Sequence, residues 1–76
     1  MIVTKIYRFT DIECPACAAK AESLIKKIKG VQGASISFFA QKVAITAEEE
    51  DFETIYPAAV AAVKKVERDC ELIFLK

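Results

Sequence analysis

Hydrophobic and polar residues follow two different periodicities along this chain, and the periodicity changes from one segment to the next. Apolar and polar residues alternate in four segments, as is typical of strands with one buried face: residues 2–10, 31–39, 42–47 and 71–75. Apolar residues recur at helical spacing in two others, residues 15–29 and 55–66. The pattern therefore predicts an α+β protein with the order strand, helix, strand, strand, helix, strand.

The ends of these segments carry residues that suit caps and turns. Pro15 fits the first helical position, where its missing N–H costs nothing, and Gly30 fits the C-cap of the same helix. Residues 40–41 are the expected tip of the hairpin between the second and third strands. In the second helix we expect Thr54 as the N-cap and Pro57 in the first turn.

One four-stranded antiparallel sheet with both helices on one face is the simplest way to close this order, which is the ferredoxin-like βαββαβ fold. Tyr7 and Phe9 would face the core from the first strand, and Leu72 and Phe74 from the last. The loop before the first helix, the hairpin tip and the turn before the last strand would meet at one end. The acidic run at residues 48–51, expected to be a solvated loop, would lie at the other end.

The composition fits one small domain, residues 1–76, and argues against several classes of protein. Eleven basic and eleven acidic residues cancel, which disfavours nucleic acid as a partner. The longest apolar run, residues 56–63, is far shorter than the about 20 residues of a membrane span, so we expect no direct insertion. The chain is still compatible with being the cytosolic end of a larger membrane protein. Three cysteines make a poor disulfide framework and indicate a reducing, cytoplasmic setting.

Candidate chemistry is concentrated in Cys14-Pro15-Ala16-Cys17, where a strand gives way to a helix. This spacing places both thiols in or just before the first helical turn, so that both sulfur atoms can converge on one point. The positive end of the helix dipole favours thiolate, and thiolates prefer soft ions such as Cu(I) and Zn(II). The motif therefore predicts that Cys14 and Cys17 bind a metal ion.

Other uses of this motif fit the chain less well. A glutaredoxin-like thiol oxidoreductase is an alternative because a proline lies between the cysteines. Such folds place a cis-proline just before a strand, however, whereas Pro57 is expected at a helix start. A structural zinc site needs four ligands, and a cysteine hydrolase needs a histidine as base. The chain has no histidine and no second Cys-x-x-Cys, so we do not expect an enzyme.

With this motif in a βαββαβ order, the chain resembles the heavy-metal-associated domain family over nearly its whole length. The family's metal loop is typically Gly-Met-x-Cys-x-x-Cys, and residues 11–17 occupy it here. Further similarity lies in Ala18-Ala19-Lys20, in Lys29-Gly30-Val31 and in the hairpin at residues 35–43. The resemblance implies that Cys14 and Cys17 are the metal ligands.

Several positions depart from the commonest pattern of the family. Asp11 stands where glycine is common, which predicts a loop less free to adopt positive φ, and Ile12 replaces a methionine that packs beneath the loop. Glu13 and the ending at residues 66–71 resemble the branch of zinc, cadmium and lead exporters among metal-transporting P-type ATPases. The resemblance therefore implies Zn²⁺, Cd²⁺ or Pb²⁺ as the preferred ion, with Cu⁺ also able to bind.

Zinc and cadmium prefer about four ligands, so a site for these ions would need further groups besides the two thiolates. Glu13 is a candidate oxygen ligand from the same loop. Cys70 is a candidate third thiolate, because the expected topology places it with Phe39, Arg68 and Asp69 at the cysteine end of the sheet. Each has a structural alternative, which is a solvated loop acid for Glu13 and a small buried side chain for Cys70.

The resemblance also implies a role in metal transport. The domain would deliver its ion to the membrane domain of a metal-transporting P-type ATPase, or serve as that ATPase's N-terminal regulatory or metal-acceptor domain. A second heavy-metal-associated domain is the other expected partner. A free-standing metallochaperone is the alternative.

Overall fold

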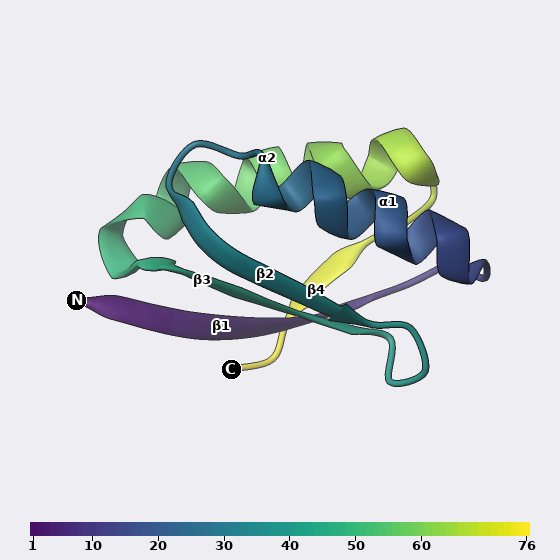
Figure 1. Cartoon of the computed structure of the whole chain (residues 1–76), viewed down its shortest axis with the longest axis horizontal. Coiled ribbons are helices and arrows are strands. Elements are labelled where there is room, and N and C mark those ends of the chain that lie inside the picture. Colours follow the sequence, from purple (N-terminus) through teal and green to yellow (C-terminus); the bar gives the residue numbers. More distant parts are fainter.

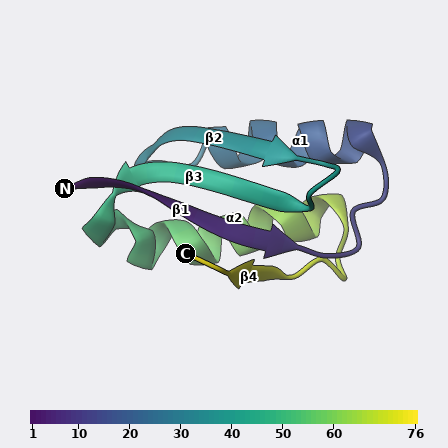
Figure 2. The same ribbon diagram turned by 90° about the horizontal axis from the view of Figure 1, so that it is seen from below.

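The computed structural model describes all 76 residues, which form one sheet covered by two helices. The sheet has the order β2-β3-β1-β4 and consists of β1 (Ile2–Phe9), β2 (Val31–Ser37), β3 (Lys42–Glu48) and β4 (Leu72–Phe74). Helices α1 (Pro15–Lys26) and α2 (Phe52–Val66) lie over the same face, and a 3₁₀ helix, η1 (Glu49–Asp51), precedes α2 (Figure 1). The opposite face of the sheet is uncovered (Figure 2). The predicted ferredoxin-like βαββαβ fold is confirmed.

Strand pairing fixes which loops share an end. All three pairings are antiparallel, and β1 pairs with β3 over most of its length. Because β1 runs toward the cysteine loop and β3 runs away from it, the β2–β3 hairpin tip lies beside that loop. The turn before β4 reaches the same place, since β4 pairs with Tyr7, Arg8 and Phe9 at the end of β1. The predicted meeting of these three segments is therefore present.

The acidic run lies at the other end of the sheet, as expected, but it is not a loop. Its first residue, Glu48, ends β3 and pairs with the amino group of Met1 at 3.1 Å. The rest forms η1, where Glu49 and Glu50 are exposed to solvent. A short helix can keep a block of like charges hydrated as well as a loop can.

The core lies between the sheet and the helices. Tyr7 and Phe9 are buried as predicted, whereas only one of the two predicted core residues of β4 is: Leu72 is buried and Phe74 is 53% exposed. Phe74 lies at the margin of the core, with its ring centroid 5.5 Å from that of Tyr7. The hydroxyl of Tyr56 donates to the Leu72 carbonyl at 2.7 Å and ties this short strand to α2.

Helix α1 is three residues shorter than the sequence indicates. It ends at Lys26 with Lys27 as its C-cap, and the amides of Lys27 and Ile28 donate to carbonyls three residues back. Gly30 is therefore not the C-cap. Its φ of 97° places it in the left-handed region, where glycine has no steric penalty and lets the chain turn into β2.

Helix α2 begins at Phe52, three residues before the predicted start. Phe52 is buried and the ammonium of Lys5 lies 4.8 Å from its ring centroid, so core packing extends the helix toward β3. Thr54 is not the N-cap, and its hydroxyl donates to the Asp51 carbonyl at 3.0 Å. Pro57 consequently lies inside the helix rather than in its first turn, on the exposed side, where water can reach the carbonyl that it leaves unpaired. Neither helix combines the length and apolar character needed to cross a membrane.

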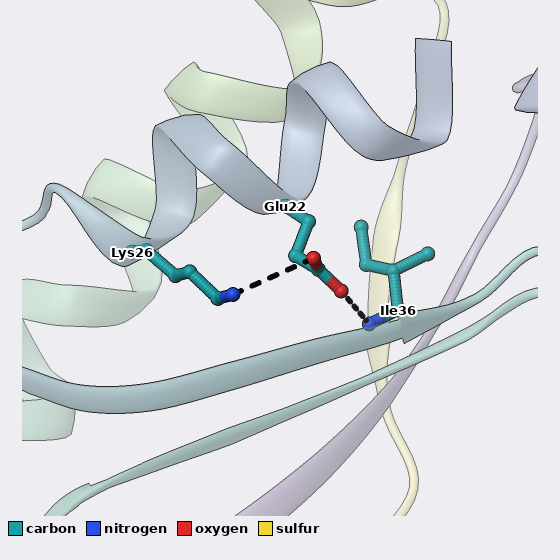
Figure 3. A network of polar contacts seen from close by, with 3 residues as sticks. All are labelled: Glu22, Lys26 and Ile36. Atoms are coloured by element: carbon teal, nitrogen blue, oxygen red, sulfur yellow. Dashed lines mark hydrogen bonds and ion pairs between the residues drawn. The ribbon is translucent and has the colours of Figure 1, made fainter. Parts of the chain in front are cut away.

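The edge strand β2 is shielded by a side chain of α1 (Figure 3). One carboxylate oxygen of Glu22 accepts a hydrogen bond from the Ile36 backbone N–H at 2.8 Å. The other lies 3.6 Å from the Lys26 ammonium, one helical turn away. Glu22 thus satisfies an outward-facing amide of β2 that would otherwise be free to pair with another chain.

Candidate metal site

The loop that carries the cysteines leaves β1 through a left-handed residue. Asp11 has φ of 62°, so the expectation that an aspartate would keep this loop from positive φ is wrong. Aspartate adopts this region more readily than most residues because its short polar side chain can interact with the local backbone. The chain then turns inward at Ile12, which is only 1% exposed and plugs the core beneath the loop, as expected for the position of the family's methionine.

Cys14 and Cys17 lie where α1 begins. Cys14 is the N-cap, with extended backbone angles (φ −121°, ψ 127°), and Pro15 is the first helical residue, as predicted. Cys17 lies in the first turn. Cys14 is exposed and Cys17 is half-buried.

The two thiols are electrostatically unequal. The pKa of the Cys14 thiol is lowered, first by the backbone N–H of Cys17 and then by the Cys17 thiol and the backbone N–H of Ala16, whose dipoles favour a negative charge on the Cys14 sulfur. The pKa of Cys17 is raised, chiefly because it gives its hydrogen bond to Cys14 and also by desolvation. The pair therefore favours one thiolate at Cys14 and one thiol at Cys17, with the helix N-terminus stabilising the negative charge.

A shallow cavity of about 270 Å³ opens over the pair. It is lined by Asp11, Ile12, Glu13, Cys14, Cys17, Val66 and Glu67. Glu67 is the one acidic neighbour that the sequence did not single out. It is the C-cap of α2, fifty residues from Cys17 along the chain, and its charge raises the pKa of Cys17 slightly whereas Lys20 lowers it. The predicted approach of the turn before β4 to the cysteine loop was the only signal that could have found it.

The two candidate extra ligands lie in different surroundings. Glu13 is exposed and lines the cavity. Cys70 is fully buried, and its thiol lies 3.7 Å from the Glu71 carbonyl as a donor. Burial raises the pKa of Cys70, which opposes the thiolate that a metal needs. No three histidine, cysteine or acidic side chains are grouped closely enough to surround an ion in this arrangement.

A match to a protein-family model shows which family the chain belongs to. The model of the heavy-metal-associated domain matches residues 6–69, which include the end of β1, the cysteine loop, both helices, β2 and β3. The chain belongs to the heavy-metal-associated domain family. Members of this family bind metal ions and are not catalytic in themselves.

Two curated relatives of this heavy-metal-associated domain are ATPases. The cadmium, zinc and cobalt-transporting ATPase of Helicobacter felis is 35% identical over 66 residues, 87% of this chain and 9% of the ATPase. A probable cadmium-transporting ATPase of Listeria monocytogenes is 42% identical over 43 residues, 57% of this chain and 6% of that protein. The chain thus spans less than a tenth of the length of the curated relatives it matches.

Solved structures agree on the fold. The N-terminal domain of a potential copper-translocating P-type ATPase from Bacillus subtilis, in its Cu(I)-loaded state, superposes with a TM-score of 0.77 at 23% identity, covering 97% of this chain and 88% of that one. The N-terminal domain of ZntA in the apo form gives 0.76 at 20% identity, covering 100% and 96%. A Cu(I)-loaded domain thus shares this architecture with a family whose curated relatives are named for cadmium, zinc and cobalt transport, and the fold does not select the ion.

Proposed function

We propose that this heavy-metal-associated domain, residues 1–76, holds one soft metal ion between the sulfur atoms of Cys14 and Cys17 and delivers it to the transport path of a metal-transporting P-type ATPase. The observation that carries the proposal is the thiol pair itself, placed at the start of α1 and lining one cavity, with Cys14 exposed and Cys17 half-buried. A metal ion binds cysteine as the thiolate, so each thiol that binds must release its proton to solvent. The lowered pKa of Cys14 therefore favours capture near neutral pH.

The preferred ion under this proposal is divalent: Zn²⁺, Cd²⁺ or Pb²⁺. Three acidic residues, Asp11, Glu13 and Glu67, line the same cavity as the two cysteines, and a divalent ion gains more than Cu⁺ does from added oxygen ligands and negative charge. The names of both curated relatives include cadmium, which agrees with this preference. Cu⁺ would still bind, because thiolates are among its favoured ligands.

Cys70 is less suited than the carboxylates to complete the shell. Its sulfur would have to leave a fully buried position and lose a proton that its surroundings retain. We therefore assign the additional oxygen ligands to Glu13 and Glu67, which form no ready-made cluster with the cysteines and would move toward the ion when it binds. We expect the Cys70→Ser variant to keep its metal affinity if it folds.

Delivery follows from the position of the site and from its unequal ligands. The carboxylates of Glu13 and Glu67 bind a soft ion more weakly than the two thiolates, so a thiolate of the partner can replace a carboxylate before either cysteine leaves. The receiving group would be the membrane domain of the ATPase or a second heavy-metal-associated domain. We place the exchange on the cytoplasmic side, where thiols stay reduced. A free-standing metallochaperone would use the same site in the same way.

Anaerobic titration with Cd²⁺, followed by thiolate-to-metal absorbance, tests the proposal. We expect one ion per chain, loss of binding in Cys14→Ser and Cys17→Ser, and weaker Cd²⁺ and Zn²⁺ binding in Glu13→Ala and Glu67→Ala with Cu⁺ binding retained. The matched control is Glu53→Ala, which removes an exposed carboxylate at the far end of α2. A reduced wild-type domain that takes up none of these ions would overturn the function. Equal effects of the three glutamate variants would overturn the divalent preference.

A further inference from the structure

We propose that Gln41, at the tip of the β2–β3 hairpin, is a positioning residue that holds the cysteine loop in the shape needed to present both thiols. The inference deepens the proposed function and rests on it. The side-chain amide of Gln41 donates a hydrogen bond to the Ile12 carbonyl at 3.2 Å, across 29 positions of sequence. Ile12 lies two residues before Cys14, so this contact reaches the loop directly upstream of the first thiol.

The main chain of Gln41 is itself fixed to the sheet. Its carbonyl accepts from the Phe9 backbone N–H at 3.0 Å, and its own N–H donates to the Phe38 carbonyl at 3.3 Å. Phe9 is the last residue of β1. Gln41 therefore makes two hydrogen bonds to this segment, one to Phe9 at the end of β1 and one to Ile12 three residues later. The left-handed turn at Asp11 lies between these two residues.

The other side of the loop is held independently. The Thr10 N–H donates to the Glu71 carbonyl at 3.2 Å, and the Glu71 N–H donates to the Thr10 hydroxyl at 3.0 Å. Together with the buried side chain of Ile12, these bonds secure the base of the loop. The Ile12 carbonyl is the point nearest to Cys14 that is held by another part of the chain, and Gln41 supplies the donor.

The backbone of Gln41 supports a role for its side chain. Its φ is 58°, in the left-handed region that non-glycine residues adopt uncommonly and glycine adopts freely. Glycine would suit this turn better if only the turn mattered. A glutamine in a strained conformation whose amide reaches the loop is therefore better explained by the contact it makes than by the turn it forms.

This arrangement separates positioning from stability in one experiment. Gln41→Gly removes the amide and relieves the backbone, so the melting temperature should stay the same or rise. In the metal-free protein, the ¹⁵N order parameters of Asp11, Ile12 and Glu13 should fall from the rigid range, about 0.85, toward values below about 0.6. Cd²⁺ should dissociate about fivefold faster, because one neutral hydrogen bond changes an equilibrium by about that factor.

Two further variants control for shape and charge. Gln41→Glu keeps the side-chain size but offers the Ile12 carbonyl no donor, so it should loosen the loop as the glycine variant does. Gln32→Glu makes the same charge change on an exposed residue at the start of β2 and should leave the loop unchanged. Unaltered loop order and Cd²⁺ dissociation in both Gln41 variants would overturn the proposal. If the wild type binds no Cd²⁺, the proposed function fails, whereas the relaxation data still decide whether Gln41 orders the loop.

Discussion

The contact between Glu22 and the edge strand allows a quantitative test of how α1 is attached to the sheet. Replacing Glu22 with alanine removes a hydrogen bond of 2.8 Å from the Ile36 N–H to a carboxylate, together with the 3.6 Å ion pair to Lys26. It also leaves a partly buried amide without its acceptor. The perturbation thus affects one bond between two elements and nothing in the hydrophobic core.

The magnitude follows from the surroundings of each group. A hydrogen bond to a charged group contributes about 1.5–3 kcal/mol. The Glu22 side chain is 30% exposed, so solvent reduces this value, and alanine regains a few tenths of a kcal/mol, about 0.3, through its helix propensity. The ion pair adds little, about 0.3–0.5 kcal/mol, because Lys26 is 55% exposed. We expect Glu22→Ala to lower the free energy of unfolding by about 1–2 kcal/mol, which corresponds to a melting temperature about 5–15 °C lower.

Urea denaturation and amide hydrogen exchange measure the two parts of this prediction. Exchange at Ile36 should be faster in Glu22→Ala, and Glu22→Gln, which keeps an acceptor but not the charge, should lose about half as much stability. Lys26→Ala is the matched control, since it removes only the ion pair and should cost no more than about 0.5 kcal/mol. The reasoning is refuted if Glu22→Ala and Lys26→Ala are equally stable and Ile36 exchanges at the wild-type rate in both.

Two other predictions concern the cysteine loop. Because the pKa of Cys14 is lowered and that of Cys17 is raised, iodoacetamide should modify Cys14 first at pH values below the ordinary thiol pKa of about 8.5. Peptide mass spectrometry measures the labelling of each cysteine, and equal labelling of the two would contradict the prediction. Ile12→Ala empties a fully buried site and should cost about 2–4 kcal/mol in urea denaturation while weakening Cd²⁺ binding. Ile2→Ala, at a 55% exposed position, should cost less than about 0.5 kcal/mol, and similar losses in the two variants would show that Ile12 does not support the loop.

The order of elements and the cysteine pair could be predicted because both are encoded locally. Alternation and helical spacing gave the six main elements, and the antiparallel pairing that they require placed the hairpin tip and the turn before β4 beside the cysteines. Pro15 at the first helical position likewise needs only its immediate neighbours. These features do not depend on contacts between residues that are far apart in the sequence.

The errors arose where a distant contact overrides a local preference. Thr54 as an N-cap and Pro57 in a first turn suggested a late start for α2, but burial of Phe52 in the core extends the helix. Glu67 looks like its polar neighbours in sequence and differs only in facing the cysteine cavity. Gln41 was recognised as a turn residue, whereas its contact with Ile12 depends on how the hairpin lies against the loop.

The burial of Cys70 separates the three cysteines of this chain into one protected thiol and two that oxidants can reach. A peroxide meets Cys14, which is exposed and the readiest to ionise, and a sulfenic acid formed there has Cys17 beside it to close a disulfide that cellular reductants reopen. Cys70 is sealed in the core with its proton held, so it cannot compete for that intermediate or form a mismatched bridge. Oxidation of the site would therefore end in the Cys14–Cys17 disulfide, which is reversible.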